Sequence, residues 1–241
     1  MSLSVQPVPI LKDNYAWLLR EAGTGATAIV DPAEEAPIVA AIKDAGGRLD
    51  LILLTHHHAD HVAAADALRL RYRARVVGAR ADAHRLPRLD RAVAEGDEVA
   101  LGAARARVIA TPGHTRGHIA YFFPESAVLA CGDTLFSLGC GRLFEGSAEE
   151  MFASLEKLKA LPAETLICCG HEYTLSNARF ALCVDPDNAA LQARAAEVAD
   201  LRASGRPSLP ARLGCELLCN PFLRARDAAE LGALRVRKDN S

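Results

Sequence analysis

Residues 49 to 61 of the chain read LDLILLTHHHADH, and this stretch decides the fold and the chemistry that the sequence predicts. Leu49 to Leu54 is short and almost wholly apolar, which is typical of a strand buried on both faces of a sheet. Thr55 to His61 follows it directly and contains four of the eight histidines of the chain. Because functional groups are usually carried by loops on a rigid sheet, we expect a site where this strand ends.

The order of the polar groups in this stretch predicts where their side chains point. In an extended segment alternate side chains lie on the same side, so His56, His58 and Asp60 should share one face. A helix that begins there would turn the chain and direct His61 toward a second, nearby metal position. His57 should face the other way, and we expect it to support the site rather than to bind metal.

Three more candidate ligands lie downstream, and each stands directly after a glycine: His114, Asp133 and His171. Glycine lets the backbone turn sharply and brings the next side chain to the end of a strand. The predicted metal ligands are therefore His56, His58, Asp60, His61, His114, Asp133 and His171. Of the other histidines, we expect His84 in a helical stretch on the surface and His118 in support of a loop.

This set of donors is too large for one metal ion. A tetrahedral zinc takes four ligands at most, so five imidazoles and two carboxylates predict two divalent ions per chain. If Asp133 bridges the pair through its two oxygens, a shared water can complete both coordination shells. Ligation by nitrogen and oxygen without thiolate fits zinc, iron or manganese.

The composition places the chain among folded proteins and disfavours several functions. Of its 241 residues, 50% are hydrophobic and 24% charged, a balance typical of globular domains with a buried core. The net charge of -2 argues against the positive field that non-specific nucleic-acid binding needs. No run of apolar residues is long enough to span a membrane.

The compartment is predicted from the first residues and from the cysteines. Met1 to Ile10 lacks the charged and apolar parts of a signal peptide, so we expect a cytoplasmic protein. We also expect it to act as a monomer. The seven cysteines include no C-x-x-C pair, which disfavours both a disulfide framework and a zinc knuckle. Small, buried thiols are expected at Cys131, Cys168, Cys169 and Cys183.

The pattern of the whole chain predicts a mixed α/β domain, a sandwich of sheets flanked by helices, followed by a helical tail. Short apolar strands alternate with helices up to about residue 170, and strand-like runs disappear from His171 onward. We therefore expect a catalytic domain over 1–170 and a helical, substrate-binding domain over 171–241. The expected helices cover Glu34 to Ala45, Asp60 to Tyr72, Ala148 to Ala160 and Asn188 to Ala203.

Several of these segments together resemble the metallo-β-lactamase superfamily, and within it the glyoxalase II (hydroxyacylglutathione hydrolase) family. The wider resemblance rests on Thr55 to His61, Gly113 to His118, Gly132-Asp133 and Gly170-His171. The narrower one rests on Gly132 to Phe136, Gly139 to Gly146, Cys169 to Thr174 and Asn220 to Arg224. These segments cover essentially the whole chain.

The resemblance implies an αββα sandwich with a small C-terminal helical domain, and hydrolysis of S-D-lactoylglutathione to D-lactate and glutathione. It assigns His56, His58 and His114 to one metal ion and Asp60, His61 and His171 to the other, bridged by Asp133. Asp60 and Asp133 are the implied catalytic carboxylates. The implied contacts to the glutathione part of the substrate are Arg142, Tyr173, Arg235 and Lys238.

The chain departs from the family pattern at three places. Ala63-Ala64 stands where two glycines are common, which could shift the start of the following helix. Phe144 stands where a tyrosine often contacts glutathione, so that hydroxyl is missing and the affinity is expected to be lower. The helical domain ends soon after Lys238 and is shorter than usual.

Three other functions compete with thioester hydrolysis. A glutathione persulfide dioxygenase of the same superfamily would use a single iron and fewer ligands, which disagrees with the presence of Asp60, His61 and His171. A β-lactam hydrolase would leave the C-terminal glutathione contacts without a purpose. A structural metal module would be rich in cysteine, unlike this set of histidines and aspartates. No Gly-x-Ser-x-Gly motif indicates a covalent thioesterase.

Overall fold

The computed structural model describes residues 3–241, which divide into two compact units. Unit 1 comprises the chain up to Ala110 together with Gly117–Gly132, and unit 2 comprises Thr111–Arg116 and Asp133–Ser241. The chain thus passes twice from unit 1 into unit 2 before the C-terminal helices begin. The expected domain boundary after residue 170 stays a prediction.

The first sheet of unit 1 carries the stretch from which the site was predicted. Its strands, in spatial order, are β1 (Leu3–Ile10), β2 (Asn14–Glu21), β3 (Thr27–Val30), β4 (Leu51–Leu53), β5 (Arg75–Ala79) and β6 (Arg91–Val93). The first three strands pair antiparallel, whereas β3 to β6 pair parallel. Leu51, Ile52 and Leu53 are all buried, so β4 is covered on both faces as predicted.

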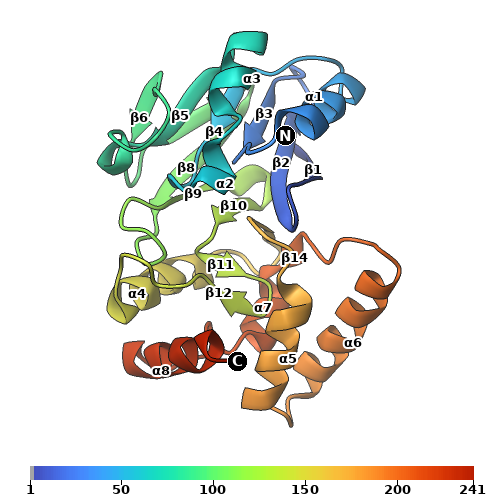
Figure 1. Cartoon of the computed structure of the whole chain (residues 1–241), viewed down its shortest axis with the longest axis vertical. Helices are drawn as coiled ribbons and strands as arrows, with labels where there is room; N and C mark the ends of the chain where they lie inside the picture. The colour runs from blue at the N-terminus through green and yellow to red at the C-terminus, as the bar shows by residue number, and fades with distance from the viewer. Residues whose placement is uncertain (1–2) are drawn as a thin grey trace. The chain divides into compact units, whose positions relative to one another are not determined.

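Two helices, α1 (Glu35–Asp44) and α3 (Ala65–Tyr72), lie against one face of this sheet (Figure 1). Ile38 and Ile42 of α1 and Leu68 of α3 are buried in one cluster with Ile29 and Ile52 of the strands. The spacing of these helix residues puts them on a single stripe, which is the face that packs on the sheet. This packing fixes the strand ends from which the candidate ligands project.

A second group of strands completes unit 1. In spatial order they are β10 (Val128–Gly132), β9 (Ile119–Phe123), β8 (Ala104–Ala110) and β7 (Glu98–Leu101), all antiparallel. The hydroxyl of Tyr121 in β9 lies 3.0 Å from the carbonyl oxygen of Leu54 and 3.2 Å from that of Val77. This buried ring therefore ties β9 to the first sheet. Two short 3-10 helices, η1 (Arg80–Asp82) and η2 (Pro124–Ser126), also belong to unit 1.

Unit 2 is mainly helical. Its elements are β11 (Leu135–Phe136), β12 (Gly139–Cys140), α4 (Ala148–Lys159), β13 (Leu166–Cys169), α5 (Thr174–Val184), α6 (Ala189–Ala203), β14 (Ala211–Arg212), α7 (Leu213–Cys219) and α8 (Ala228–Asp239). Strands β11 and β12 form a hairpin, and β13 pairs with β14. Leu138, Ala178 and Leu191 belong to one buried cluster that joins the hairpin to α5 and α6.

The structure differs from the sequence predictions at several places. The expected helix over Asp60 to Tyr72 is interrupted, because α2 (Ala59–Val62) ends before α3 begins. The amide of Ala64 donates to the carbonyl of Pro32 rather than to a carbonyl of its own helix. Strands also continue past His171, because β14 pairs with β13 there. Cys183 was expected to be buried and is exposed.

Across residues 3–241, every helix is too short or too polar to cross a lipid bilayer. None of the cysteines in this part of the chain forms a disulfide. Cys131, Cys168 and Cys169 are buried, as the sequence predicted.

Candidate metal centre

The histidine-rich stretch leaves the carboxyl end of β4 in an extended conformation and then enters α2. His58 is still extended, with φ -60° and ψ 141°, and the helix begins at Ala59. Nε2 of His56 and Nδ1 of His58 lie 3.1 Å apart, so the predicted shared face of these two rings is present. Asp60 lies within the first turn of α2 rather than in the extended segment.

A buried aspartate that the sequence analysis missed holds this stretch in place. Asp31 follows β3, the parallel neighbour of β4, and its carboxylate accepts hydrogen bonds from the Thr55 amide at 2.8 Å and the Thr55 hydroxyl at 2.6 Å. Oδ2 of Asp31 also lies 3.1 Å from Nδ1 of His61. β3 and β4 are adjacent parallel strands, so they end at the same edge of the sheet and bring Asp31 close to the histidine-rich stretch. The local sequence does not encode which strands are adjacent, so it gave no sign of this contact.

These contacts fix which ring nitrogen of His61 carries the proton. An ionised carboxylate is an acceptor only, so the proton of the neutral His61 ring lies on Nδ1, and Nε2 keeps its lone pair. That Nε2 lies 3.6 Å from Oδ2 of Asp60. Asn14, which was also missed, donates from Nδ2 to Oδ2 of Asp60 at 3.0 Å and to its carbonyl oxygen at 3.1 Å. Unit 1 therefore presents oriented nitrogen and oxygen donors.

The other histidines of unit 1 lie in three different surroundings. Nδ1 of His57 lies 3.0 Å from Oδ2 of Asp82, a buried carboxylate on η1. The ring of His118 stacks on that of His56 with 4.8 Å between centroids. His84 is exposed, but it lies in a turn rather than in a helix.

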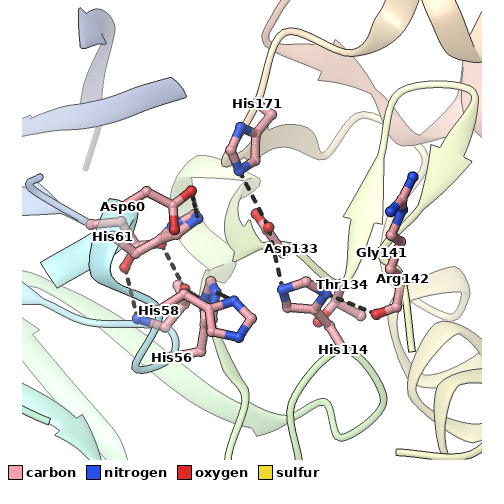
Figure 2. Close-up of polar contacts among 12 residues, drawn as sticks. His56, His58, Asp60, His61, His114, Asp133, Thr134, Gly141, Arg142 and His171 are labelled. Atoms are coloured by element: carbon pink, nitrogen blue, oxygen red, sulfur yellow. Dashed lines mark hydrogen bonds and ion pairs between the residues drawn. The ribbon is translucent and has the colours of Figure 1, made fainter. Parts of the chain in front are cut away.

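Unit 2 brings together His114, Asp133 and His171, all buried (Figure 2). Oδ2 of Asp133 lies 3.4 Å from Nε2 of His114 and 3.3 Å from Nε2 of His171. Nδ1 of His114 lies 2.8 Å from the carbonyl oxygen of Arg142. A carbonyl can only accept, so Nδ1 carries the proton and Nε2 of His114 is left with a lone pair.

Glycines shape the loops of unit 2 where larger residues would not fit. Gly113 has a φ of +151°, and a Cβ there would lie 2.9 Å from the side chain of Met151 in α4. A Cβ on Gly141 would lie 1.9 Å from the carbonyl oxygen of Asp133. Both glycines are therefore required for the close approach of the loops that carry His114, Asp133 and Arg142.

The donors fit a divalent metal ion better than they fit a purely structural polar cluster. They are imidazole nitrogens and carboxylate oxygens, and the rings of His61 and His114 are oriented through their other nitrogen, the usual arrangement of metal-binding histidines. Burial raises the pKa of the Cys140 thiol to about 12 and that of Cys169 still further, which disfavours these two thiols as thiolate ligands.

The predicted glutathione contacts lie in unit 2 with unequal exposure. The Tyr173 ring stacks on His171, with 4.5 Å between centroids and 6° between planes. Phe144, which lacks the tyrosine hydroxyl, is exposed and packs edge-on against His114. Nζ of Lys238 donates to the hydroxyl of Ser176 at 3.0 Å. Arg235 is buried, and its Nη1 donates to the carbonyl oxygen of Cys140 at 2.8 Å.

The hairpin that joins Asp133 to Arg142 is held by a buried carboxylate that the sequence analysis also missed. Glu216 on α7 accepts hydrogen bonds from the Ser137 hydroxyl and the Leu138 amide, both at 2.6 Å. Asn220 donates to Glu216 at 3.1 Å and to the carbonyls of Phe136 and Gly139 at 3.0 Å. Burial raises the pKa of Glu216 from its ordinary value.

Comparison with known proteins identifies the family. Residues 11–171 match the model of the metallo-beta-lactamase superfamily, and residues 172–241 match that of the hydroxyacylglutathione hydrolase C-terminus. Hydroxyacylglutathione hydrolase of Acidiphilium cryptum is 60% identical over 236 residues, which cover 98% of this chain and 96% of that protein. The chain belongs to the hydroxyacylglutathione hydrolase family. The enzyme of the same name from Rhodospirillum rubrum is 56% identical, with 94% and 89% covered.

Solved structures of other proteins share the fold. ETHE1 from Myxococcus xanthus is 26% identical with a TM-score of 0.71, and the match covers 98% of this chain and 90% of that one. The BLEG-1 B3 metallo-beta-lactamase, at 23% identity and a TM-score of 0.72, covers 92% of this chain and 100% of its own and shares the fold. The predicted metallo-β-lactamase fold with a helical C-terminal domain is therefore confirmed.

Proposed function

We propose that this chain hydrolyses S-D-lactoylglutathione to D-lactate and glutathione with the help of two divalent metal ions. The observation that carries the proposal is the near full-length identity of 60% to a protein named hydroxyacylglutathione hydrolase. The imidazole and carboxylate donors of the chain would supply the ligands that such a reaction needs. Membership of the family thus gives the substrate class, and the donor set gives the kind of centre.

The proposed ligands fall into two groups. His56, His58 and His114 would hold one ion, and Asp60, His61 and His171 the other. Asp133 would bind both, and two contacts support this role, because the ligating nitrogens of His114 and His171 lie within 3.4 Å of the same Asp133 oxygen. Zinc suits these donors, and iron and manganese suit them as well.

Two divalent ions in such a centre supply Lewis acidity and lower the pKa of coordinated water to roughly 7. The residues of the chain orient the donors and neutralise charge. Asp31 and the Arg142 carbonyl keep the protons of His61 and His114 on Nδ1. Asn14 holds the carboxylate of Asp60. The leaving group is a thiolate whose conjugate thiol has a pKa of about 8.5, so the reaction needs no strong general acid from the protein.

Substrate recognition is proposed for Arg142, Tyr173 and Lys238, and Arg235, which is buried, is proposed to support them. The carboxylates of glutathione are the natural partners of the cationic side chains. Tyr173 lies on His171, so a group bound against its ring would be next to a proposed metal ligand. The carboxylates of glutathione lie far from the thioester bond that breaks, so contacts to them should affect KM more than kcat.

The cellular setting is a further part of the same proposal. We propose a cytoplasmic, monomeric enzyme, and cysteines that form no disulfide within residues 3–241 fit a reducing compartment. Sedimentation of the purified protein would test the monomer.

The experiment that tests the proposed reaction compares two substrates under the same conditions. The purified protein should hydrolyse S-D-lactoylglutathione with release of D-lactate, and it should consume no oxygen with glutathione persulfide. Iron-dependent oxygen uptake without thioester hydrolysis would overturn the proposal in favour of a dioxygenase.

A further inference from the structure

Two arginines of unit 2 meet on one oxygen of Asp239, the last residue of α8. Nη2 of Arg235 lies 2.8 Å and Nε 3.2 Å from Oδ1 of Asp239. Nε of Arg142, on the loop after β12, lies 3.3 Å from the same oxygen. The carboxylate therefore connects a residue of the C-terminal helix to a residue of the loop that follows the hairpin.

The guanidinium of Arg235 is already fully engaged within the protein. Besides Asp239, it donates from Nη1 to the carbonyl oxygen of Cys140 at 2.8 Å, and it lies over the Phe222 ring at 5.4 Å from the centroid. Arg235 is only 6% exposed. A substrate carboxylate could reach it only by breaking these contacts, so Arg235 serves better as an anchor for Asp239 and β12 than as a direct contact.

Arg142 has the opposite character. Its side chain is 61% exposed, and within residues 3–241 the ion pair to Asp239 is the one polar contact of its guanidinium. That contact uses Nε and leaves both terminal nitrogens available for a carboxylate. Figure 2 shows the Arg142 carbonyl directed toward His114 and the guanidinium directed away from it. The backbone of Arg142 therefore contacts the His114 ring, while its side chain can contact a different group.

We propose that Asp239 is a positioning residue for substrate recognition. Arg235 anchors the carboxylate of Asp239, and this carboxylate holds Nε of Arg142. The terminal nitrogens of Arg142 are thereby placed to meet a glutathione carboxylate. This inference rests on the proposed function, because that carboxylate belongs to the glutathione part of the substrate. An arginine that is already held loses less conformational entropy when it binds. Two guanidinium groups compensate the charge of Asp239, which limits its repulsion of the incoming carboxylate.

The test begins with Asp239→Asn, which keeps the shape of the side chain and removes its charge. KM for S-D-lactoylglutathione should rise about twofold to fivefold, the size expected for a partly exposed ion pair, while kcat and metal content stay unchanged. Asp200→Asn, the same change at an exposed position of α6, should leave KM unchanged. The melting temperatures of both variants would report on folding.

A second pair of measurements tests whether Asp239 acts through Arg142. Arg142→Ala should raise KM about tenfold, the size expected when a charged hydrogen bond is lost. In that background Asp239→Asn should add little, since the side chain it positions is gone. A small neutral thioester without carboxylates should be hydrolysed by wild type and by the Asp239 variant with the same KM.

Three results would overturn the inference: an unchanged or lower KM in Asp239→Asn, effects of the two substitutions that add in full, or an equal rise in KM for the neutral thioester. Calorimetric titration with glutathione separates this inference from the proposed function. Wild-type protein that binds glutathione more tightly than Asp239→Asn supports the positioning role even if thioester hydrolysis fails. Equal affinities in a hydrolytically active enzyme reject the role and leave the proposed function standing.

Discussion

Asp133 is the residue on which most of the proposed chemistry depends. Asp133→Ala should release the shared ligand, leave two mutually repelling cations poorly held, and lower kcat by at least about 100-fold. Metal analysis and steady-state kinetics of the variant would measure both effects, and His84→Ala, at an exposed position, should change neither. Near-normal turnover with both ions bound would show that Asp133 is not the bridge.

Which residues the sequence could predict depends on where their signal lies. The seven proposed ligands could be picked out because each follows a strand end or a glycine, and these marks are local. Asp31 also follows a strand end, but its position beside His61 arises from the pairing of β3 with β4, and that of Asn14 beside Asp60 arises from the start of β2, so neither position is marked locally. Arg235 was predicted from the family resemblance, which did not reveal that its guanidinium is buried and engaged.

The loop that carries His114 depends on helix α4 behind it. Gly113→Ala would place a methyl group 2.9 Å from Met151 at a φ of +151°, so the loop must shift and carry His114 with it. We expect a loss of stability of about 1–3 kcal/mol, together with lower metal content and kcat. Gly205→Ala also has a positive φ but meets nothing within 4 Å, so it should cost about 1 kcal/mol and leave activity unchanged. Equal activity of the two variants would contradict this account of the loop.

The turn between β2 and β3 contributes stability that depends on pH. The Thr24 hydroxyl and the amides of Gly23 and Thr24 donate to Glu21 and lower its pKa from 4.5 to about 2. A carboxylate with a depressed pKa stabilises the fold fully above its unfolded value, and this contribution is lost as the pH falls from about 4.5 toward 2. Melting temperatures of wild type and Glu21→Gln should therefore differ most near pH 7 and converge in acid.

A matched substitution separates this effect from a general loss of charge. Glu98→Gln, at the exposed start of β7, should change the melting temperature little at any pH. A difference between wild type and Glu21→Gln that stays constant from pH 7 to pH 3 would show that the carboxylate charge is not what stabilises the turn.

At the scale of elements, periodic segments were predicted well and short ones were missed. Helix α4 and strand β4 have clear patterns, and their predicted and observed bounds agree closely. The hairpin β11–β12 and strand β14 have only two residues in each strand, too few for any period to appear. The break between α2 and α3 was also missed, because it follows from contacts of Asp60 and Ala64 with Asn14 and Pro32, which are distant in sequence.

For the whole molecule, the sequence predicted the fold through its family resemblance, and the comparisons confirmed it. The division into compact units was harder to foresee. Two short segments, Thr111–Arg116 and the start of the hairpin, belong to unit 2 although they precede the helical region. The proposed ligands are consequently divided, with His56, His58, Asp60 and His61 in unit 1 and His114, Asp133 and His171 in unit 2.

The number of bound ions is the property of the whole enzyme on which the proposed function depends most. Because the proposed reaction needs metal, its removal by a chelator should abolish hydrolysis of S-D-lactoylglutathione. The most direct measurement is the return of activity as zinc is added back to the metal-free protein, with bound metal counted at each step. Activity should rise until about two ions per chain are bound. Full activity at one ion per chain would contradict the two-metal centre.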